Sequence, residues 1–427
     1  MSPASFAYQY PSKTRFSGPG RPTGLDPQLL LPADRRLQQL AEVPGDRPGW
    51  AQDLVQIARA VYLADKLSSR ALSDDGWTRH IELSVEVVEP DRWTERTLVL
   101  LSRLLEALSS DHWAINVRPG AVRWPHQGRM LSAQQVQEVA LFSGGLDSTA
   151  HAVERSTAGA GDLLLVSYYE PHWGRQQDVA LATIRTAASR GIQQFKASQQ
   201  VRAPNVELEK SARTRGLLYM ATAVYLAAVH DVPHIAVPEN GQLALNPALT
   251  PARAAACSTR SVHPGTLSLL NEIIGTVGGT ATVINPYLHL TKGEVCQRAL
   301  RAGLEGATLT NATVSCGRPP RDRPDPHCGC CYPCLVRHSG LLTALGDDDT
   351  PYVKDVWAMA DRLAATDDRR ALQRWLSEPF GVRDLFTDLP VPEGSDLTAL
   401  VDVVQRGRTE LTRMFVRHHK LVRAAIR

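Results

Sequence analysis

Two regions of the chain differ in the spacing of their apolar residues. Over 53–70 the apolar side chains recur every three or four positions, which predicts an amphipathic helix. Residues 80–87 alternate between polar and apolar, which predicts a strand with one buried face. A helix over 97–108 and a strand over 113–117 follow, so we expect a small α+β domain at 49–135.

The segment 1–48 precedes this domain and is rich in Pro, Gly, Ser and Arg. Prolines at this density exclude a long helix or a central strand, because each removes a backbone N–H donor. We therefore expect 1–48 to be an extended, Pro-rich arm that lies over the body of the protein or is partly disordered.

From residue 136 onward, short apolar strands alternate with helices. This alternation is typical of an α/β fold with an open, mostly parallel sheet that is wrapped on both faces. The expected strands are 139–142, 163–168, 234–237 and 282–285. One expected helix follows residue 148 and ends near 155, and the others cover 179–189, 217–229 and 292–302. We place this domain at 136–344. Residues 345–427 are expected to form a helical C-terminal region, with helices over 356–365 and 397–416.

A loop suited to phosphate binding joins the first of these strands to its helix. It reads Ser143-Gly144-Gly145-Leu146-Asp147-Ser148. Two glycines let the backbone turn tightly, and the free N–H groups of a helix N-terminus attract an anion. Asp147 can cap the helix or hold Mg²⁺ against the phosphates. An ordinary glycine turn is the plainer interpretation, but the carboxyl end of a strand is where such sheets bind ligands.

Five of the seven cysteines lie between positions 316 and 334. Four of them have the spacing C-x₁₁-C-x₂-C-x₂-C: Cys316, Cys328, Cys331 and Cys334. This spacing is typical of a closed, structural Zn²⁺ site. An iron–sulfur cluster and a site without metal remain open as alternatives. Cys330 breaks the spacing and is excluded as a ligand, whereas His327 is a conceivable substitute.

The phosphate loop resembles the SGGxDS motif of the PP-loop ATP pyrophosphatases, which share the fold of the adenine nucleotide alpha hydrolases. The resemblance covers about residues 138–340. It implies that ATP is cleaved between its α and β phosphates, that a substrate oxygen is adenylated and that pyrophosphate is released.

The cysteine cluster narrows this resemblance. Residues 328–337 resemble the CGxCxxCxxR ending of the QueC family, the 7-cyano-7-deazaguanine synthases, and 313–316 matches the segment at their upstream cysteine. Residues 291–295 resemble their TKxEI segment, in which the lysine, here Lys292, faces the nucleotide phosphates. The resemblance implies a deazapurine carboxylate, 7-carboxy-7-deazaguanine, as substrate, and catalytic roles for Asp147 and Lys292. A solvated Lys292 after a helix cap is the alternative.

The polar stretch 237–264 resembles the PENG…LNPxLTPAR…STRxxHP segment of QueC-like proteins in bacterial anti-phage operons, either of the Qat type (QatC) or the related type IV CBASS component. It supplies the candidate substrate-binding residues Glu239, Asn240, Arg253, Thr259, Arg260 and His263. A carboxylate beside an amide suits the N–H edge of a guanine-like ring, and arginine suits a carboxylate or phosphate. A solvated surface loop is the alternative interpretation. Arg213 and Arg215, before the helix at 217–229, are candidate ATP ligands or merely part of a helix start.

The chain departs from the queuosine-pathway enzymes in two ways. Their FDYGQ segment is replaced here by residues 167–176, and regions are added before 136 and after 344. We expect the added regions to hold a partner protein whose N-terminal amine accepts the deazaguanine acyl group. The alternatives are a queuosine-pathway synthase that uses ammonia, a catalytically silent nucleotide-binding scaffold and a tRNA-thiolating enzyme.

Charge and hydropathy exclude several other classes. A net charge of +3 over 427 residues argues against direct nucleic-acid binding. No run reaches the roughly 18 apolar residues of a membrane span, and no basic stretch followed by an apolar one marks a secretory leader. Clustered cysteines suit a reducing compartment, so we expect the protein to be cytoplasmic.

Overall fold

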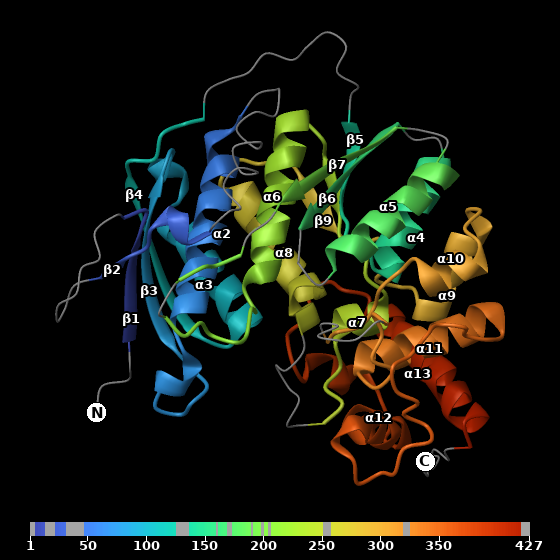
Figure 1. Ribbon diagram of the computed structural model, residues 1–427. Helices are drawn as coiled ribbons and strands as arrows, with labels where there is room; N and C mark the ends of the chain where they lie inside the picture. The colour runs from blue at the N-terminus through green and yellow to red at the C-terminus, as the bar shows by residue number, and fades with distance from the viewer. Residues whose placement is uncertain are drawn as a thin grey trace.

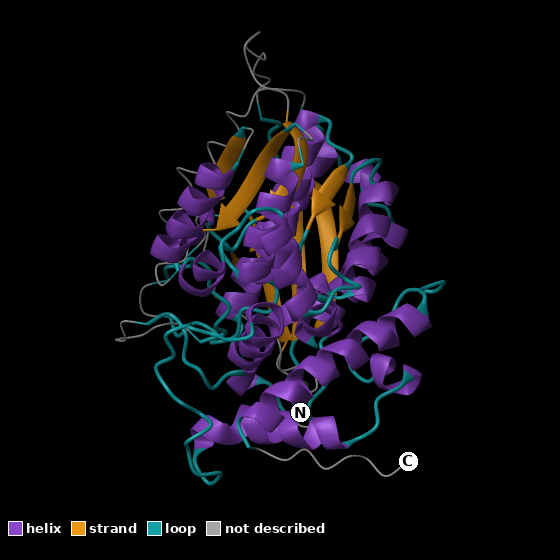
Figure 2. Cartoon of the chain, turned by 90° about the vertical axis from the view of Figure 1, so that its right-hand side faces the viewer, coloured by secondary structure: helices purple, strands orange, loops and turns teal. Residues whose placement is uncertain are grey.

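The computed structural model describes residues 5–12, 22–30, 47–124, 136–158, 161–168, 173–188, 191–197, 200–203, 206–250, 258–318 and 325–419. Arg253 and most of the expected arm lie outside these residues. The described part contains two parallel sheets in the upper half of the view and a helical layer below them (Figures 1 and 2).

The larger sheet has five parallel strands in the order β7-β6-β5-β8-β9. They are β5 (Val136–Leu141), β6 (Asp162–Tyr168), β7 (Ile192–Ala197), β8 (His234–Ala236) and β9 (Thr282–Ile284). Alternate residues of β6 enter different cores. Leu163 and Leu165 share a core with α4 (Leu146–Thr157) and α5 (Gly174–Ala187), whereas Leu164 and Val166 share one with α6 (Arg215–His230). Helices therefore cover both faces, and the expected α/β fold is confirmed.

The smaller sheet has four parallel strands in the order β2-β1-β3-β4. They are β1 (Ser5–Tyr10), β2 (Thr23–Gly24), β3 (His80–Val87) and β4 (His112–Pro119). Because β1 pairs with both β2 and β3, the expectation that the N-terminal arm contains no central strand is wrong for residues 5–10. Pro11 stands directly after the strand, where its missing N–H removes no ladder bond.

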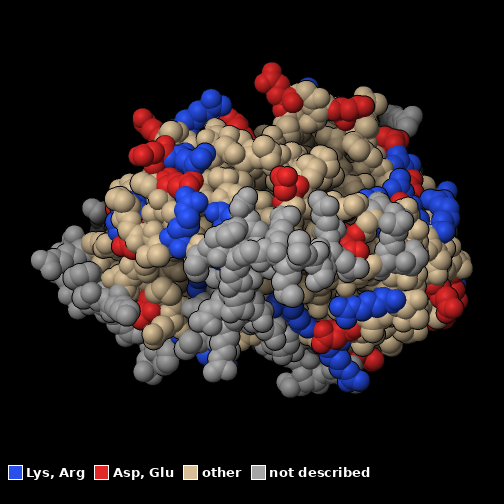
Figure 3. Space-filling model, turned by 90° about the horizontal axis from the view of Figure 1, so that it is seen from above, with Lys and Arg blue, Asp and Glu red and all other residues tan. Residues whose placement is uncertain are grey.

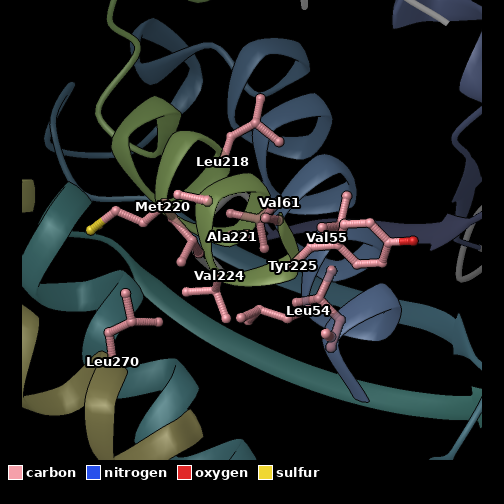
Figure 4. Close-up of a cluster of buried hydrophobic side chains, with 14 of the residues drawn as sticks. Leu54, Val55, Val61, Leu218, Met220, Ala221, Val224, Tyr225 and Leu270 are labelled. Atoms are coloured by element: carbon pink, nitrogen blue, oxygen red, sulfur yellow. The ribbon is translucent and has the colours of Figure 1, made fainter. Parts of the chain in front are cut away.

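One hydrophobic core joins the two sheets. Helices α2 (Gly49–Leu67) and α3 (Glu95–Ser109) of the smaller sheet pack against α6 and α8 (Pro264–Thr276) of the larger one. Figure 4 shows the meeting of α2 and α6, with Leu54, Val55 and Val61 facing the helix that carries Leu218, Val224 and Tyr225. Packing thus continues across the expected boundary at residue 135.

The C-terminal region packs under the carboxyl ends of the larger sheet. The remaining helices are α7 (Gly241–Leu245), α9 (Lys292–Arg301), α10 (Gly306–Asn311), α11 (Tyr332–Leu345), α12 (Asp367–Ser377) and α13 (Leu397–Arg417). The helix expected over 356–365 is wrong. The Asp355 carboxylate accepts the N–H groups of Trp357 and Ala358 and holds a turn there, and α12 begins only at Asp367.

The surface and helices of the described residues show two further features. None of these helices is both long and apolar enough to cross a bilayer. On the face seen in Figure 3, the acidic and basic side chains that are drawn lie interspersed. That described surface therefore presents no broad field of one sign.

Candidate functional site

The site lies where the strand order of the larger sheet reverses. From β5 the chain goes outward to β6 and β7, then returns to the other side for β8 and β9. Ligands of open α/β sheets bind in the crevice at the carboxyl ends of the strands at such a switch point. The loop after β5 contains residues 143–148, and the segment after β8 contains Glu239 and Asn240.

The loop geometry leaves the N-terminus of α4 open to an anion. Gly144 has φ of +75°, and Gly145 is the N-cap residue, with no side chain capping α4. A Cβ at Gly144 would lie 2.9 Å from the Cα of Gln177, so only glycine fits there. The Ser143 and Ser148 hydroxyls lie 3.2 Å apart on the loop. Backbone N–H groups and hydroxyls thus converge as phosphate binding requires.

Asp147 and Lys292 form a buried ion pair beside this loop. The Lys292 Nζ lies 2.8 Å and 2.7 Å from the two carboxylate oxygens, and both side chains are nearly buried. Asn240 donates from its backbone and its side chain to the same carboxylate. Burial would raise the pKa of Asp147, but the Lys292 charge and these donors lower the pKa to about 2. Both oxygens are engaged, so Asp147 can ligate Mg²⁺ directly only if Lys292 moves away.

Glu239 is the second carboxyl beside Lys292, whose Nζ lies 3.9 Å away. Burial and the neighbouring Asp147 charge raise the pKa of Glu239 well above 4.5. Burial opposes the charge on Lys292, yet the two carboxyls raise the pKa of that ammonium. The pKa shifts of the two carboxyls are therefore opposite in direction: Asp147 favours its ionised form, and Glu239 favours its protonated form.

The start of α9 fixes the position of Lys292. Thr291 caps the helix in a capping box with Glu294, and Thr291 also donates its hydroxyl to Glu410 of α13. Glu410 accepts the Gly293 N–H at 3.1 Å, and burial raises the pKa of its carboxyl to about 7. A Cβ at Gly340 would lie 2.4 Å from the Lys292 side chain, so α11 leaves only a narrow channel for it. The C-terminal region thus packs against the site directly.

Two cavities of about 300 Å³ each adjoin the loop. The first is bounded by the loop, Lys292, Thr259 and the segment at Cys316. The second lies between β6 and α6 and is bounded by apolar and aromatic side chains together with Arg215. Both are lined by Ser143, Ser148 and Glu239. The loop therefore serves two neighbouring compartments, each large enough for part of a ligand.

The four cysteines predicted as metal ligands come together. Their sulfur atoms all lie within 4.8 Å of one another, and the pairs 316/331 and 328/334 are each 3.9 Å apart. A tetrahedron with Zn–S bonds of about 2.3 Å has edges of about 3.8 Å, so the residues fit a zinc ion. The Cys331 N–H also points at the Cys328 sulfur, as in a metal-binding turn. This cluster can hold zinc, which would stabilise one wall of the first cavity.

The neighbours of the cluster take other roles. Cys330 lies outside the group of four, and the His327 Nε2 accepts the Ser315 N–H. Arg337 is fully buried and donates to the Thr313 hydroxyl and to the carbonyls of Leu309 and Thr310. It therefore positions the segment that leads to Cys316.

The structure brings most of the predicted site residues to these cavities. Those that line the first cavity are Ser143, Gly145, Leu146, Asp147, Ser148, Glu239, Thr259, Lys292 and Cys316. Arg215 lines the second, near the ring of Tyr219. The buried Thr259 hydroxyl has no hydrogen-bond partner among the described residues, so it is available to a ligand.

Outside the phosphate loop and the cysteine cluster, four predicted residues of the described part are not brought to the cavities. The Arg213 guanidinium lies over the Trp77 ring and donates to the Ser109 carbonyl. Arg260 pairs with Asp388, and His263 caps α8. Asn240 is fully buried, and its side chain is used by Asp147, Glu239 and Leu243. These four side chains position backbone and neighbouring groups instead of facing the cavities.

Sequence reasoning missed Trp173, Gln176 and Gln177. All three line the cavities, from the start of α5. Their position could have indicated this role, because they follow β6, and β6 lies next to β5, the strand that precedes the phosphate loop. The segment does not match the FDYGQ pattern, so the position was not recognised.

Fold and site together define a doubly wound α/β protein with a glycine loop and an open helix N-terminus at its switch point and a four-thiol cluster beside them. No family model matches the chain. Over 80 residues it is 39% identical to a 7-cyano-7-deazaguanine synthase of Novosphingobium aromaticivorans. The match covers 18% of this chain and 31% of that enzyme, so the chain spans about a third of the curated relative it matches. The likeness is therefore confined to a part of each chain.

Proposed function

We propose that the chain is a QueC-like ligase that adenylates the carboxylate of a 7-deazaguanine with ATP and transfers the acyl group to an amine. The meeting of two cavities at one phosphate-binding loop carries this proposal. A reaction that joins two ligands through a phosphorus atom needs both of them held against the same loop. The partial likeness to a 7-cyano-7-deazaguanine synthase supports 7-carboxy-7-deazaguanine as the carboxylate.

The first step needs positioning and charge stabilisation, and no side-chain nucleophile. A carboxylate oxygen of the deazaguanine attacks the α-phosphorus, and the bond from that phosphorus to the oxygen bridging to the β-phosphate breaks. The charge on the departing pyrophosphate is compensated by the N-terminus of α4 and by Lys292, which Asp147 holds in place. Mg²⁺ bound with ATP would neutralise part of the phosphate charge.

In the second step a neutral amine attacks the acyl carbon. The new C–N bond forms, the nitrogen loses a proton, and AMP leaves with the electron pair of the broken C–O bond. We propose the N-terminal amine of a partner protein, in a cytoplasmic anti-phage system, as this amine. An α-amine with a pKa of about 7.7–8.0 is partly neutral at cellular pH, whereas a lysine at about 10.4 is not.

Exchange of radioactive pyrophosphate into ATP tests the adenylation step. We expect exchange that depends on added 7-carboxy-7-deazaguanine. Binding of ATP without exchange would instead support a silent nucleotide-binding scaffold.

Intact-mass analysis of the operon partner, co-expressed with and without this chain, tests the acceptor. A mass increase that matches one deazaguanine acyl group supports the protein acceptor. An unchanged partner together with free 7-cyano-7-deazaguanine from ammonia would support the synthase alternative, which the name of the partial relative favours.

A further inference from the structure

The second cavity contains a buried hydrogen-bond acceptor that the protein leaves unused. Gln177 on α5 is only 5% exposed and lines this cavity. Its Nε2 donates to the Tyr168 carbonyl at 3.0 Å, where β6 ends. Its Oε1 has no hydrogen-bond partner among the described residues. A buried carbonyl oxygen without a donor is costly, and a ligand N–H would recover that cost.

The orientation of this amide is fixed by its surroundings. Turning it over would place Oε1 against the Tyr168 carbonyl, so that two acceptors would face each other. The backbone of Gln177 is also held, because its N–H donates to the Trp173 carbonyl and its Cα packs against Gly144 of the phosphate loop. The acceptor therefore has one defined position beside the loop.

The walls around this acceptor suit a flat ring. Tyr168 and Tyr219 are stacked with ring centroids 3.9 Å apart, and the Tyr168 hydroxyl is occupied by Thr222 and the Leu218 carbonyl. The apolar side chains of Phe142, Met220 and Val237 also line the cavity. Ligand sites of this kind combine apolar walls with a few polar groups that fix orientation. The ligand's charged end would lie at the loop serines, which border the same cavity.

We propose that the Gln177 Oε1 accepts a hydrogen bond from an N–H edge of a purine-type base and selects against rings that lack it. This inference rests on the proposed function, which brings two such bases to the protein. Adenine of ATP would donate its 6-amino group, and the deazaguanine would donate N1–H or its 2-amino group. A site built around a buried acceptor rejects an analogue without the donor, because the acceptor is then left unpaired.

Calorimetric binding to wild type and to Gln177→Met tests the inference. The first ligand pair is α,β-methylene-ATP and the corresponding purine riboside triphosphate, which lacks the 6-amino group. The second is 7-carboxy-7-deazaguanine and 7-carboxy-7-deazapurine, which lacks both N1–H and the 2-amino group. Gln177→Leu, which also lacks the acceptor, provides a second variant should the methionine protein fail to fold.

We expect wild type to prefer the donor-bearing member of one pair by about tenfold or more, the value of one hydrogen bond to a buried acceptor. Gln177→Met should lose that preference, and so should Gln177→Leu. Loss in the nucleotide pair identifies adenine as the base, and loss in the carboxylate pair identifies the deazaguanine.

Preferences that persist unchanged in Gln177→Met, or that are absent from wild type for both pairs, would overturn the inference. If wild type binds neither α,β-methylene-ATP nor the carboxylate, the proposed function fails, and this inference fails with it. Binding without a preference that depends on Gln177 overturns the inference alone.

Discussion

The molecule buries two clusters of charged side chains, and they differ in how completely the protein satisfies them. In the first, Arg79 is fully buried between the smaller sheet and α2. Its five N–H donors all reach acceptors, on Asp65, Asp111 and the Ser68 carbonyl. Thr214 at the start of α6 donates to the remaining oxygen of Asp65. Arg70 also pairs with Asp111, and its Nε lacks a partner among the described residues. Because every donor of Arg79 is used, we call this the closed cluster, and it ties the two sheets together.

The second cluster is the one at the phosphate loop. Lys292 there faces two carboxyls, and burial together with the neighbouring Asp147 charge raises the pKa of one of them, Glu239. A cavity of about 300 Å³ borders the cluster, and the buried Thr259 hydroxyl on its wall is unpaired among the described residues. Asp147 and Lys292 are nearly as buried as the first cluster, whereas the Glu239 side chain is 23% exposed, and the described residues alone do not satisfy the site.

The difference shows that burial of charge does not by itself identify a functional site. A buried pair whose donors and acceptors are all used serves the fold, and breaking it leaves an uncompensated charge. Surplus donors, a perturbed carboxyl and an adjoining cavity point instead to a ligand that completes the network. The two clusters should therefore respond differently to substitution.

The largest effect is expected from the cysteine cluster. It is the extreme case of an unsatisfied cluster, because its ligand atoms all carry charge of one sign and need a cation to compensate them. Cys331→Ser should reduce bound zinc well below one ion per chain and lower stability by several kcal/mol. Structural zinc contributes about 10–16 kcal/mol to the folding of zinc-finger peptides. Elemental analysis and urea unfolding measure the two effects. Cys330→Ser is the matched control, since Cys330 lies outside the group of four. Equal zinc loss in both variants would contradict the assignment.

The next largest effect is expected from the closed cluster. Arg79→Met leaves the buried Asp65 without its arginine and Asp111 with Arg70 alone, and should cost about 3–5 kcal/mol of unfolding free energy. Activity per folded molecule should stay near wild type. Arg96→Met is the control, because its ion pair with Glu272 is exposed and such pairs contribute about 0–1 kcal/mol. A stability equal to that of the control would break the comparison.

Lys292→Met should reduce activity more than stability, the opposite of what we expect for Arg79→Met. We expect pyrophosphate exchange to fall about 10²–10³-fold, as when one donor to developing charge is removed. Its stability loss should be smaller than that of Arg79→Met, because Asp147 can take up a proton beside the cavity. Lys196→Met, which breaks a pair with the exposed Asp178, is the control. Full exchange activity in Lys292→Met, with a loss of stability, would make this cluster structural as well.

How much of the fold and of the candidate site could be predicted from the sequence depended on how far apart the interacting residues lie along the chain. The phosphate loop and the cysteine spacing are local, so their place at a strand end and the approach of four thiols could be predicted from a few residues. The alternation of strands and helices predicted the open parallel sheet, but its strand order, and with it the switch point, came from the structure.

The rest required contacts that no local pattern records. Arg260 meets Asp388 across 128 positions, and Glu410 reaches the start of α9 from the C-terminal helix. Arg213 resembled a phosphate ligand in sequence but lies on Trp77. The pairing of β1 with β3 depends on residues about 75 positions apart, and prolines concealed the strand.

The smallest effect on stability is expected from Glu239, the carboxyl with a raised pKa in the cluster at the phosphate loop. Burial and the Asp147 charge hold the pKa of Glu239 well above 4.5, so the folded chain keeps a proton that the unfolded chain loses as pH rises past 4.5. The folded state then binds more protons, and this group's contribution to stability falls with rising pH until the folded pKa is passed. Glu239→Gln cannot titrate and has the shape of the protonated acid. Its unfolding free energy relative to wild type should therefore increase from pH 5 to pH 8, by an amount on the order of 1 kcal/mol.

Urea unfolding at several pH values measures this change in unfolding free energy, with Glu82→Gln on the exposed face of β3 as the control. A difference between Glu239→Gln and wild type that is the same at pH 5 and pH 8 would mean that Glu239 is ionised in the folded protein, and the surplus negative charge would then have to be compensated by Lys292 alone.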